Sequence, residues 1–112
     1  MLSEKLFKCV ILKRPFIRLG MPRSLTRFKE WGFKTFDGVL FDESYDDMEN
    51  FYDRLNCIIP QVEKYLSMSF DELKEKVYSA EVQQIIEHNY NLAYEIYNNK
   101  EEGKIDVWTK IL

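Results

Sequence analysis

Four carboxylates stand close together near the middle of the chain, and their types and spacing make them the first candidates for chemistry. They are Asp42, Glu43, Asp46 and Asp47. Carboxylate oxygens are the ligands that divalent cations such as Ca²⁺ prefer. The four residues lack the regular alternation and the glycine of a calcium loop, so their spacing favours an acidic turn that leads into a helix. We therefore predict no metal site, and we assign these residues to a surface that contacts another protein.

The other reactive side chains do not form a catalytic group in the sequence. His88 is the only histidine, and neither a cysteine nor a serine lies beside it at helical spacing. Cys9 and Cys57 are too few for a disulfide framework and lack metal-ligand spacing, which predicts reduced thiols in a cytoplasmic protein. Gly20 and Gly32 are isolated, so no glycine-rich phosphate loop is present. No catalytic residue is predicted.

Charge is divided unevenly along the chain, whose 112 residues carry a net charge of −3. Up to Lys34 there are nine basic and two acidic residues, and from Thr35 onward there are seven basic and seventeen acidic residues. Such a division can steer partners or anionic ligands. It can equally let the two parts attract each other within one domain. Both interpretations stay open at this point, and the second is favoured.

Length and composition predict one domain, residues 1–112, with a core of its own. The chain is 46% hydrophobic and 15% aromatic, which is enough to bury a core at this length. No apolar run approaches the ~20 residues that span a bilayer, and the charged start of the chain is unlike a signal peptide. Tyr90, Tyr94 and Tyr97 favour a helix rim over a base-stacking platform. We expect a cytoplasmic protein with no contact to a membrane or to nucleic acid.

The elements expected in residues 1–44 alternate between helix and strand. Apolar residues at helical spacing predict a helix over 4–12, which Pro15 ends. A short buried strand is predicted over 16–19, Ser24 should cap the next helix, and a second strand is predicted over 33–36. A right-handed crossover would make the strands parallel. The predicted fold class is therefore α/β, with a small two- to three-stranded parallel sheet that forms part of a Rossmann-like lobe.

Residues 45–112 are expected to be helical. Apolar residues recur three or four apart over 48–66, where Pro60 should kink or split the helix. Residues 69–72 are typical of a capping box that opens a short helix, and Ser79 should cap a long one. An apolar tail is then expected to pack back on the domain, or else to form an interaction patch. Its apolar members are Val107, Trp108, Ile111 and Leu112.

Several segments occur in an order that resembles a known family. They are Ser3-Glu4-Lys5-Leu6-Phe7-Lys8, Lys13-Arg14-Pro15-Phe16-Ile17, Gly20, Gly32-Phe33-Lys34-Thr35-Phe36, Asp42-Glu43-Ser44-Tyr45-Asp46 and, later, Ile86-Glu87-His88-Asn89. In this order they resemble the C-terminal part of glycosyltransferase-like proteins of bacteriophages and marine viruses. Those proteins are similar to the fucosyltransferase and exostosin type, in which two Rossmann-like domains face each other. The resemblance covers about residues 3–97.

The resemblance implies a nucleotide-sugar site at Glu4 and Lys5, which Arg14 could widen. In the similar enzymes, the glutamate of this motif is expected to hold a ribose and the lysine a diphosphate. The chemistry agrees with general rules, because a carboxylate accepts from hydroxyls and an ammonium at a helix start adds to backbone donors around phosphate. On residue types alone, Glu4 is a favourable charge at a helix N-terminus and Lys5 is a solvated charge.

The resemblance also implies that activity would need parts not expected here. In the similar enzymes, preceding strands complete the donor domain, and an acceptor domain supplies the catalytic base. A transfer site must position two substrates and exclude water, so an independent glycosyltransferase is not expected. We predict a non-catalytic viral interaction protein that contacts a host or viral protein through the acidic segment or an aromatic helical face, and that could modulate a host factor. The alternative is a nucleotide-sugar-binding subunit that works with a separate acceptor lobe. A homodimer through exposed strand edges is a further option.

Overall fold

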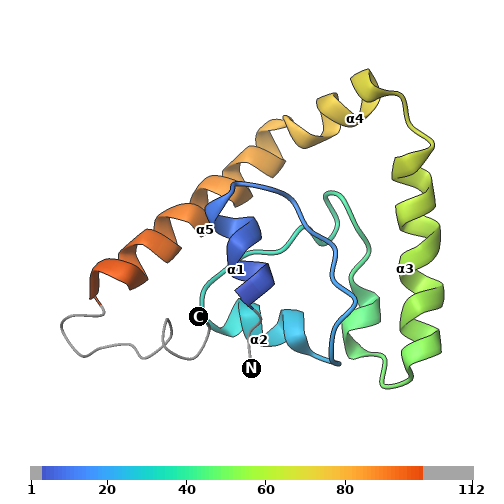
Figure 1. The fold of residues 1–112 in the computed structure, drawn as a ribbon, viewed down its shortest axis with the longest axis horizontal. Coiled ribbons are helices and arrows are strands. Elements are labelled where there is room, and N and C mark those ends of the chain that lie inside the picture. The colour runs from blue at the N-terminus through green and yellow to red at the C-terminus, as the bar shows by residue number, and fades with distance from the viewer. Residues whose placement is uncertain (1–3, 100–112) are drawn as a thin grey trace.

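The computed structural model describes residues 4–99, which form five α-helices and one 3₁₀ helix (Figure 1). They are α1 (Glu4–Ile11), α2 (Ser24–Glu30), η1 (Ser44–Asp47), α3 (Phe51–Leu66), α4 (Phe70–Val77) and α5 (Ala80–Asn99). Helices α3, α4 and α5 form a bent frame, and the rest of the described chain lies within its angle. The molecule measures 46 × 34 × 19 Å, so its shortest dimension is about two helix diameters. The predicted apolar tail lies outside the described residues.

The predicted parallel sheet is wrong. Residues 4–99 contain no β-strand, and the one β-type contact described is an isolated bridge between Asp37 and Phe41. The segments 16–19 and 33–36 are irregular, and they meet through the rings of Phe16 and Phe36, whose centroids are 5.2 Å apart. What was predicted as an α/β part therefore consists of α1, α2 and irregular connections, and the described chain is helical.

Side chains, rather than a neighbouring strand, satisfy the backbone of the second predicted strand. Asn89 Oδ1 accepts from the Lys34 N–H at 2.8 Å, and Asn89 Nδ2 donates to the Lys34 carbonyl at 2.8 Å. The Phe36 N–H donates to Glu43 Oε2 at 3.2 Å. Buried backbone groups need such partners. Because α5 and the η1 region supply them, this apolar segment lies in the core without a strand beside it.

The predicted caps of the last two helices are confirmed. Ser69 Oγ accepts from the Glu72 N–H at 3.2 Å at the start of α4, and Ser79 Oγ accepts from the Val82 N–H at 3.4 Å at the start of α5. Side-chain oxygens in these positions satisfy donors that have no partner within the helix. Pro60 does not split the helix, because α3 runs through this exposed proline as one helix.

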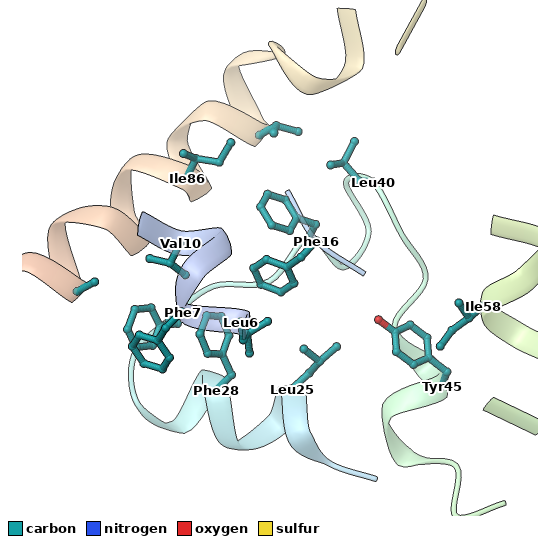
Figure 2. Close-up of a cluster of buried hydrophobic side chains, with 14 of the residues drawn as sticks. Leu6, Phe7, Val10, Phe16, Leu25, Phe28, Leu40, Tyr45, Ile58 and Ile86 are labelled. Atoms are coloured by element: carbon teal, nitrogen blue, oxygen red, sulfur yellow. The ribbon is translucent and has the colours of Figure 1, made fainter. Parts of the chain in front are cut away.

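An aromatic core holds α1 and α2 against α5 (Figure 2). The Phe28 and Phe33 rings stack at 4.5 Å, and Phe7 and Phe16 meet them edge-on at 5.2 and 5.6 Å. All four rings are at most 7% exposed. Rings of this size bury more apolar area than most side chains, and edge-to-face pairs add to it. The same core includes Leu6 and Val10 of α1, Val82, Ile86, Ala93 and Ile96 of α5, and Leu25, Phe36, Leu40, Tyr45 and Ile58.

The α3–α4 arm (residues 51–77) is attached differently. Helix α3 packs against η1, with Arg54 and Ile58 buried, while α4 packs against α5. None of the eight residues of α4, all of them described, is buried. Leu66 and Phe70, at the junction of the two helices, are 80% and 78% exposed. The arm thus carries apolar side chains that the described part of the fold does not cover.

Candidate protein-interaction groove

The structure divides the four carboxylates predicted to contact a partner. Glu43 and Asp46 are buried, at 5% and 7% exposure, whereas Asp42 and Asp47 are exposed. A buried carboxylate is not presented to another protein. That these residues contact a partner therefore stays a prediction. Of the four, only Asp42 and Asp47 are exposed enough to do so.

Asp46 acts as the cap of α2. Its Oδ1 accepts from the Leu25 N–H at 2.9 Å, and its Oδ2 accepts from the Thr26 N–H at 2.9 Å and from Thr26 Oγ1 at 2.8 Å. A carboxylate at a helix N-terminus satisfies free N–H groups and complements the helix dipole. The prediction that Ser24 caps this helix is wrong, because Ser24 is its first residue. Arg23 holds the cap position with a φ of 62° and has no side-chain cap.

Glu43 and Asp42 are also used within the fold. Glu43 Oε1 lies 3.9 Å from Lys29 Nζ. Burial raises the pKa of Glu43, and hydrogen bonding to Thr35 and the Lys29 charge oppose that rise. Asp42 Oδ1 accepts from the Ser44 N–H at 3.0 Å, and the hydrogen bonds from Ser44 lower the pKa of Asp42.

The ion pairs of the described chain support the interpretation that its basic and acidic parts attract each other within one domain. They join Lys13 to Glu87 at 3.0 Å, Arg23 to Glu49 at 2.7 Å and Lys29 to Glu43 at 3.9 Å. Each therefore connects the basic first part of the chain to the acidic remainder. The Lys13–Glu87 and Arg23–Glu49 pairs are exposed, so they add little to stability, whereas Glu43 of the third pair is buried.

Of the three residues predicted to bind a nucleotide sugar, the structure describes the side chain of Arg14. Glu4 and Lys5 are the first residues of α1, and their side chains are outside what is described. Arg14 is exposed after α1 and borders a crevice with Cys9 and Phe16 that has no free volume the size of a water molecule. The nucleotide-sugar role of Glu4, Lys5 and Arg14 stays a prediction.

An apolar groove lies between the two helices of the α3–α4 arm. Its volume is about 300 Å³. Val62 and Leu66 line it from α3, and Leu73 and Val77 line it from α4. The floor consists of Pro15, Ile17, Leu40, Phe41 and Tyr65. We call this the α3–α4 groove.

A more polar chamber adjoins the α3–α4 groove. It has a volume of about 410 Å³, and Leu40, Phe41 and Tyr65 line it as well as the groove. The Phe41 and Tyr65 rings meet edge-on at 5.4 Å, and the Tyr65 hydroxyl donates to the Leu40 carbonyl. These three residues therefore form a fixed ridge between the two spaces. The other residues that line the polar chamber are Gly38, Val39, Asp42, Cys57, Gln61, Lys64 and Lys76.

Gln61 of α3 is hydrogen-bonded to the backbone of Asp42, and both residues line the polar chamber. Gln61 Oε1 accepts from the Asp42 N–H at 2.7 Å, and Gln61 Nε2 donates to the Asp42 carbonyl at 2.8 Å. The same amide nitrogen donates to the Cys57 carbonyl at 3.1 Å. These bonds occupy the amide and hold α3 against the loop before η1. The amide is thus committed to the fold rather than to a ligand.

Comparison of the chain with protein-family models, with curated proteins and with solved structures gives no match. The resemblance to glycosyltransferase-like proteins and the viral origin that it implies therefore stay predictions. Within residues 4–99, no helix has the length and apolar character needed to cross a membrane. The described residues also contain no group of three or more side chains that could hold a metal ion.

The sequence prediction missed the groove, although a signal for it was present. The predicted helix over 48–66 has apolar residues on more than one side. A helix that packs on a core with one face needs apolar residues on that face alone. When the apolar surface of a helix is wider than the rest of the fold can cover, the uncovered part indicates a surface for a partner. Positions 70, 73 and 77 repeat this pattern in the next helix. Lys64 and Lys76 could not be recognised from the sequence as lining the polar chamber, because charged residues on helices are usually only solvated.

Proposed function

We propose that this chain is an interaction protein that binds an apolar helical segment of a partner protein in the α3–α4 groove. The observation that carries the proposal is that α4 turns Leu73 and Val77 to the groove although none of its residues is buried. A helix of eight residues is marginal in water on its own. A bound segment would cover its apolar face and stabilise it.

The shape and lining of the α3–α4 groove suit side chains from one face of a helix. Two helices form its walls, and apolar side chains line walls and floor alike. A helix that docks in a groove presents anchors at positions i, i+3 or i+4, and i+7. The space of about 300 Å³ admits such anchors while the backbone of the bound helix stays outside.

The floor of the groove is held in place before any partner arrives. Tyr65 is fixed by its contact with the Phe41 ring and by its hydrogen bond to Leu40. Burial raises the pKa of Tyr65, so the phenol stays protonated and keeps donating over the ordinary pH range. A surface that is already formed loses less conformational entropy on binding.

The experiment that tests this function is a selection from a displayed library of helical peptides about 16 residues long, a length that supports a helix in water. Wild-type protein is the target, and the variant Leu66→Asp is used for counter-selection. Leu66 lines the groove but is 80% exposed, so the aspartate should leave the fold intact. Enriched peptides are expected to carry apolar residues at i, i+3 or i+4, and i+7.

Affinities of the enriched peptides complete the test. Fluorescence anisotropy should show at least a tenfold weaker affinity for Leu66→Asp, about 1.4 kcal/mol. Phe70→Asp is the matched control, because Phe70 is 78% exposed and does not line the groove. That variant should bind like the wild type. The proposal fails if no enriched peptide depends on Leu66, or if both variants weaken binding equally.

A further inference from the structure

We infer that the segment bound in the α3–α4 groove is acidic as well as apolar, and that its carboxylates pair with Lys64 and Lys76 in the adjoining polar chamber. The inference rests on the proposed function of the groove and names the class of partner: a protein segment with apolar anchors on one face and carboxylates beside them. Two observations support it, namely the state of the two amines and the position of the chamber.

The first observation is that two amines from different helices line one chamber without an ion-pair partner. Lys64 belongs to α3 and Lys76 to α4, and both are exposed. Among the described residues, neither amine forms an ion pair or a hydrogen bond. Lys64 Nζ lies over the Tyr65 ring at 5.8 Å from its centroid, which leaves its N–H groups free for an anion.

The second observation is that, among the described residues, a single carboxylate lines the chamber beside these two amines, so the positive charge is in excess. The carboxylate among its lining residues belongs to Asp42, and Oδ1 of that group accepts from the Ser44 N–H. Two ammonium groups therefore share the chamber with one carboxylate that is already hydrogen-bonded. The amide of Gln61 is bonded to the backbone of Asp42. The charge of the chamber is thus complementary to an acidic ligand.

The chamber also adjoins the space that the bound segment would fill. The ridge of Leu40, Phe41 and Tyr65 is shared by the groove and the chamber. A helix advances 5.4 Å per turn, so the turns next to those in the groove can reach across this ridge. Carboxylates on those turns would meet Lys64 and Lys76 while the apolar anchors stay in the groove. A protein segment is favoured over a small anion because one ligand must satisfy both spaces.

Two peptides separate charge from apolar contact. Both carry the same leucines at i, i+4 and i+7, and the remaining positions are glutamate in one peptide and lysine in the other. Two exposed charge pairs predict an affinity about tenfold higher for the glutamate peptide at low salt. The double variant Lys64→Glu/Lys76→Glu should reverse this preference. Lys74→Glu is the matched control, since Lys74 belongs to α4 but does not line the chamber.

Cys57 offers a readout located in the chamber itself. Its thiol lines the polar chamber and is free, and Cys9→Ser removes the other thiol of the chain. In that background, the glutamate peptide should slow the alkylation of Cys57 by iodoacetamide, and the lysine peptide should slow it less. Dodecanoate is the third ligand in this assay, because a fatty acid also combines an apolar chain with a carboxylate.

The outcomes distinguish this inference from the proposed function. Equal affinity for both peptides, with binding still lost in Leu66→Asp, overturns the acidic partner and leaves the groove as the binding surface. Protection of Cys57 by dodecanoate but not by the glutamate peptide overturns the inference in favour of a lipid carboxylate. Failure of every peptide to bind, together with an empty library selection, removes the proposed function itself. Reversal of preference by the double variant, with Lys74→Glu unchanged, supports the inference.

Discussion

The aromatic core and the α3–α4 arm use apolar residues in opposite ways. In the core, the rings of Phe7, Phe28 and Phe33 are almost completely covered by one another and by α5. In the arm, Leu66 is 80% exposed, and α4 contributes no buried residue at all. Apolar area stabilises a fold only when it is removed from water. The core residues, Ile58 of α3 among them, thus contribute to the stability of the isolated chain, whereas the exposed apolar residues of the arm, such as Leu66, contribute only when something covers them.

This difference locates the binding surface. Single exposed apolar residues are normal on proteins, and their presence alone carries no meaning. In the arm, however, apolar side chains from two helices face one groove whose floor is held by Tyr65 and Leu40. This arrangement supports the proposed helix-binding site, and the unpaired Lys64 and Lys76 support the proposed preference for acidic ligands.

The largest predicted effect separates core from arm by stability. Phe28 is fully buried, so Phe28→Ala should lower the free energy of unfolding by about 3–5 kcal/mol through lost burial and a new cavity. A loss of that size is a large part of the stability of a small domain. Leu66→Ala should change it by less than about 0.5 kcal/mol. Urea denaturation followed by circular dichroism measures both, and equal losses would contradict the comparison.

A second prediction concerns the buried carboxylate that caps α2. Asp46 accepts three hydrogen bonds through two oxygens, and an asparagine offers only one acceptor oxygen. Asp46→Asn should therefore destabilise the protein by about 1–3 kcal/mol. Asp47→Asn, at an exposed neighbouring position, is the control and should be close to neutral. If the two variants unfold at the same urea concentration, Asp46 is not the cap described.

The smallest predicted effect has the opposite sign and depends on pH. Burial raises the pKa of Glu43 above its ordinary value, so the folded state binds this proton more readily than the unfolded state. Stability from this group is present at low pH and is lost as pH rises through the folded pKa. Glu43→Gln keeps an acceptor for the Phe36 N–H and removes the charge.

Glu43→Gln should accordingly be more stable than the wild type at neutral pH, and the difference should shrink as the pH is lowered through the pKa of Glu43. Urea unfolding at a series of pH values tests this. The gain should be smaller than the loss for Asp46→Asn, because Lys29 already offsets part of the burial. A variant less stable than the wild type at neutral pH would show that the Lys29 pair outweighs the burial of the charge.

Local signals in the sequence predicted the helices, but the sheet that they also predicted is absent from the described residues. Ser69 and Ser79 lie at the helix starts that they cap, and Gly32, which follows the end of α2, has a positive φ of 97°. The predicted strand over 33–36 failed for the opposite reason. Its partner is Asn89, 55 residues from Lys34, and no local pattern reveals that an amide will replace a strand.

The candidate sites differ in the same way. The acidic residues were recognised by type, yet Asp46 is buried because α2 needs a cap, and that need became visible only when the two segments were placed together. The groove depends on the absence of covering elements over Leu73 and Val77 within the described chain, and the apolar pattern alone does not reveal it. The residues could be identified as apolar, but not as uncovered.

The central claim is that the α3–α4 groove is completed by a bound helical segment. Backbone amide hydrogen exchange tests it most directly, on the free protein and on its complex with a peptide from the library selection. The account predicts that α4 exchanges faster than α5 in the free protein, and that protection rises in α4 and the second half of α3 on binding. Unchanged exchange in both helices, with new protection elsewhere in the chain, would contradict it.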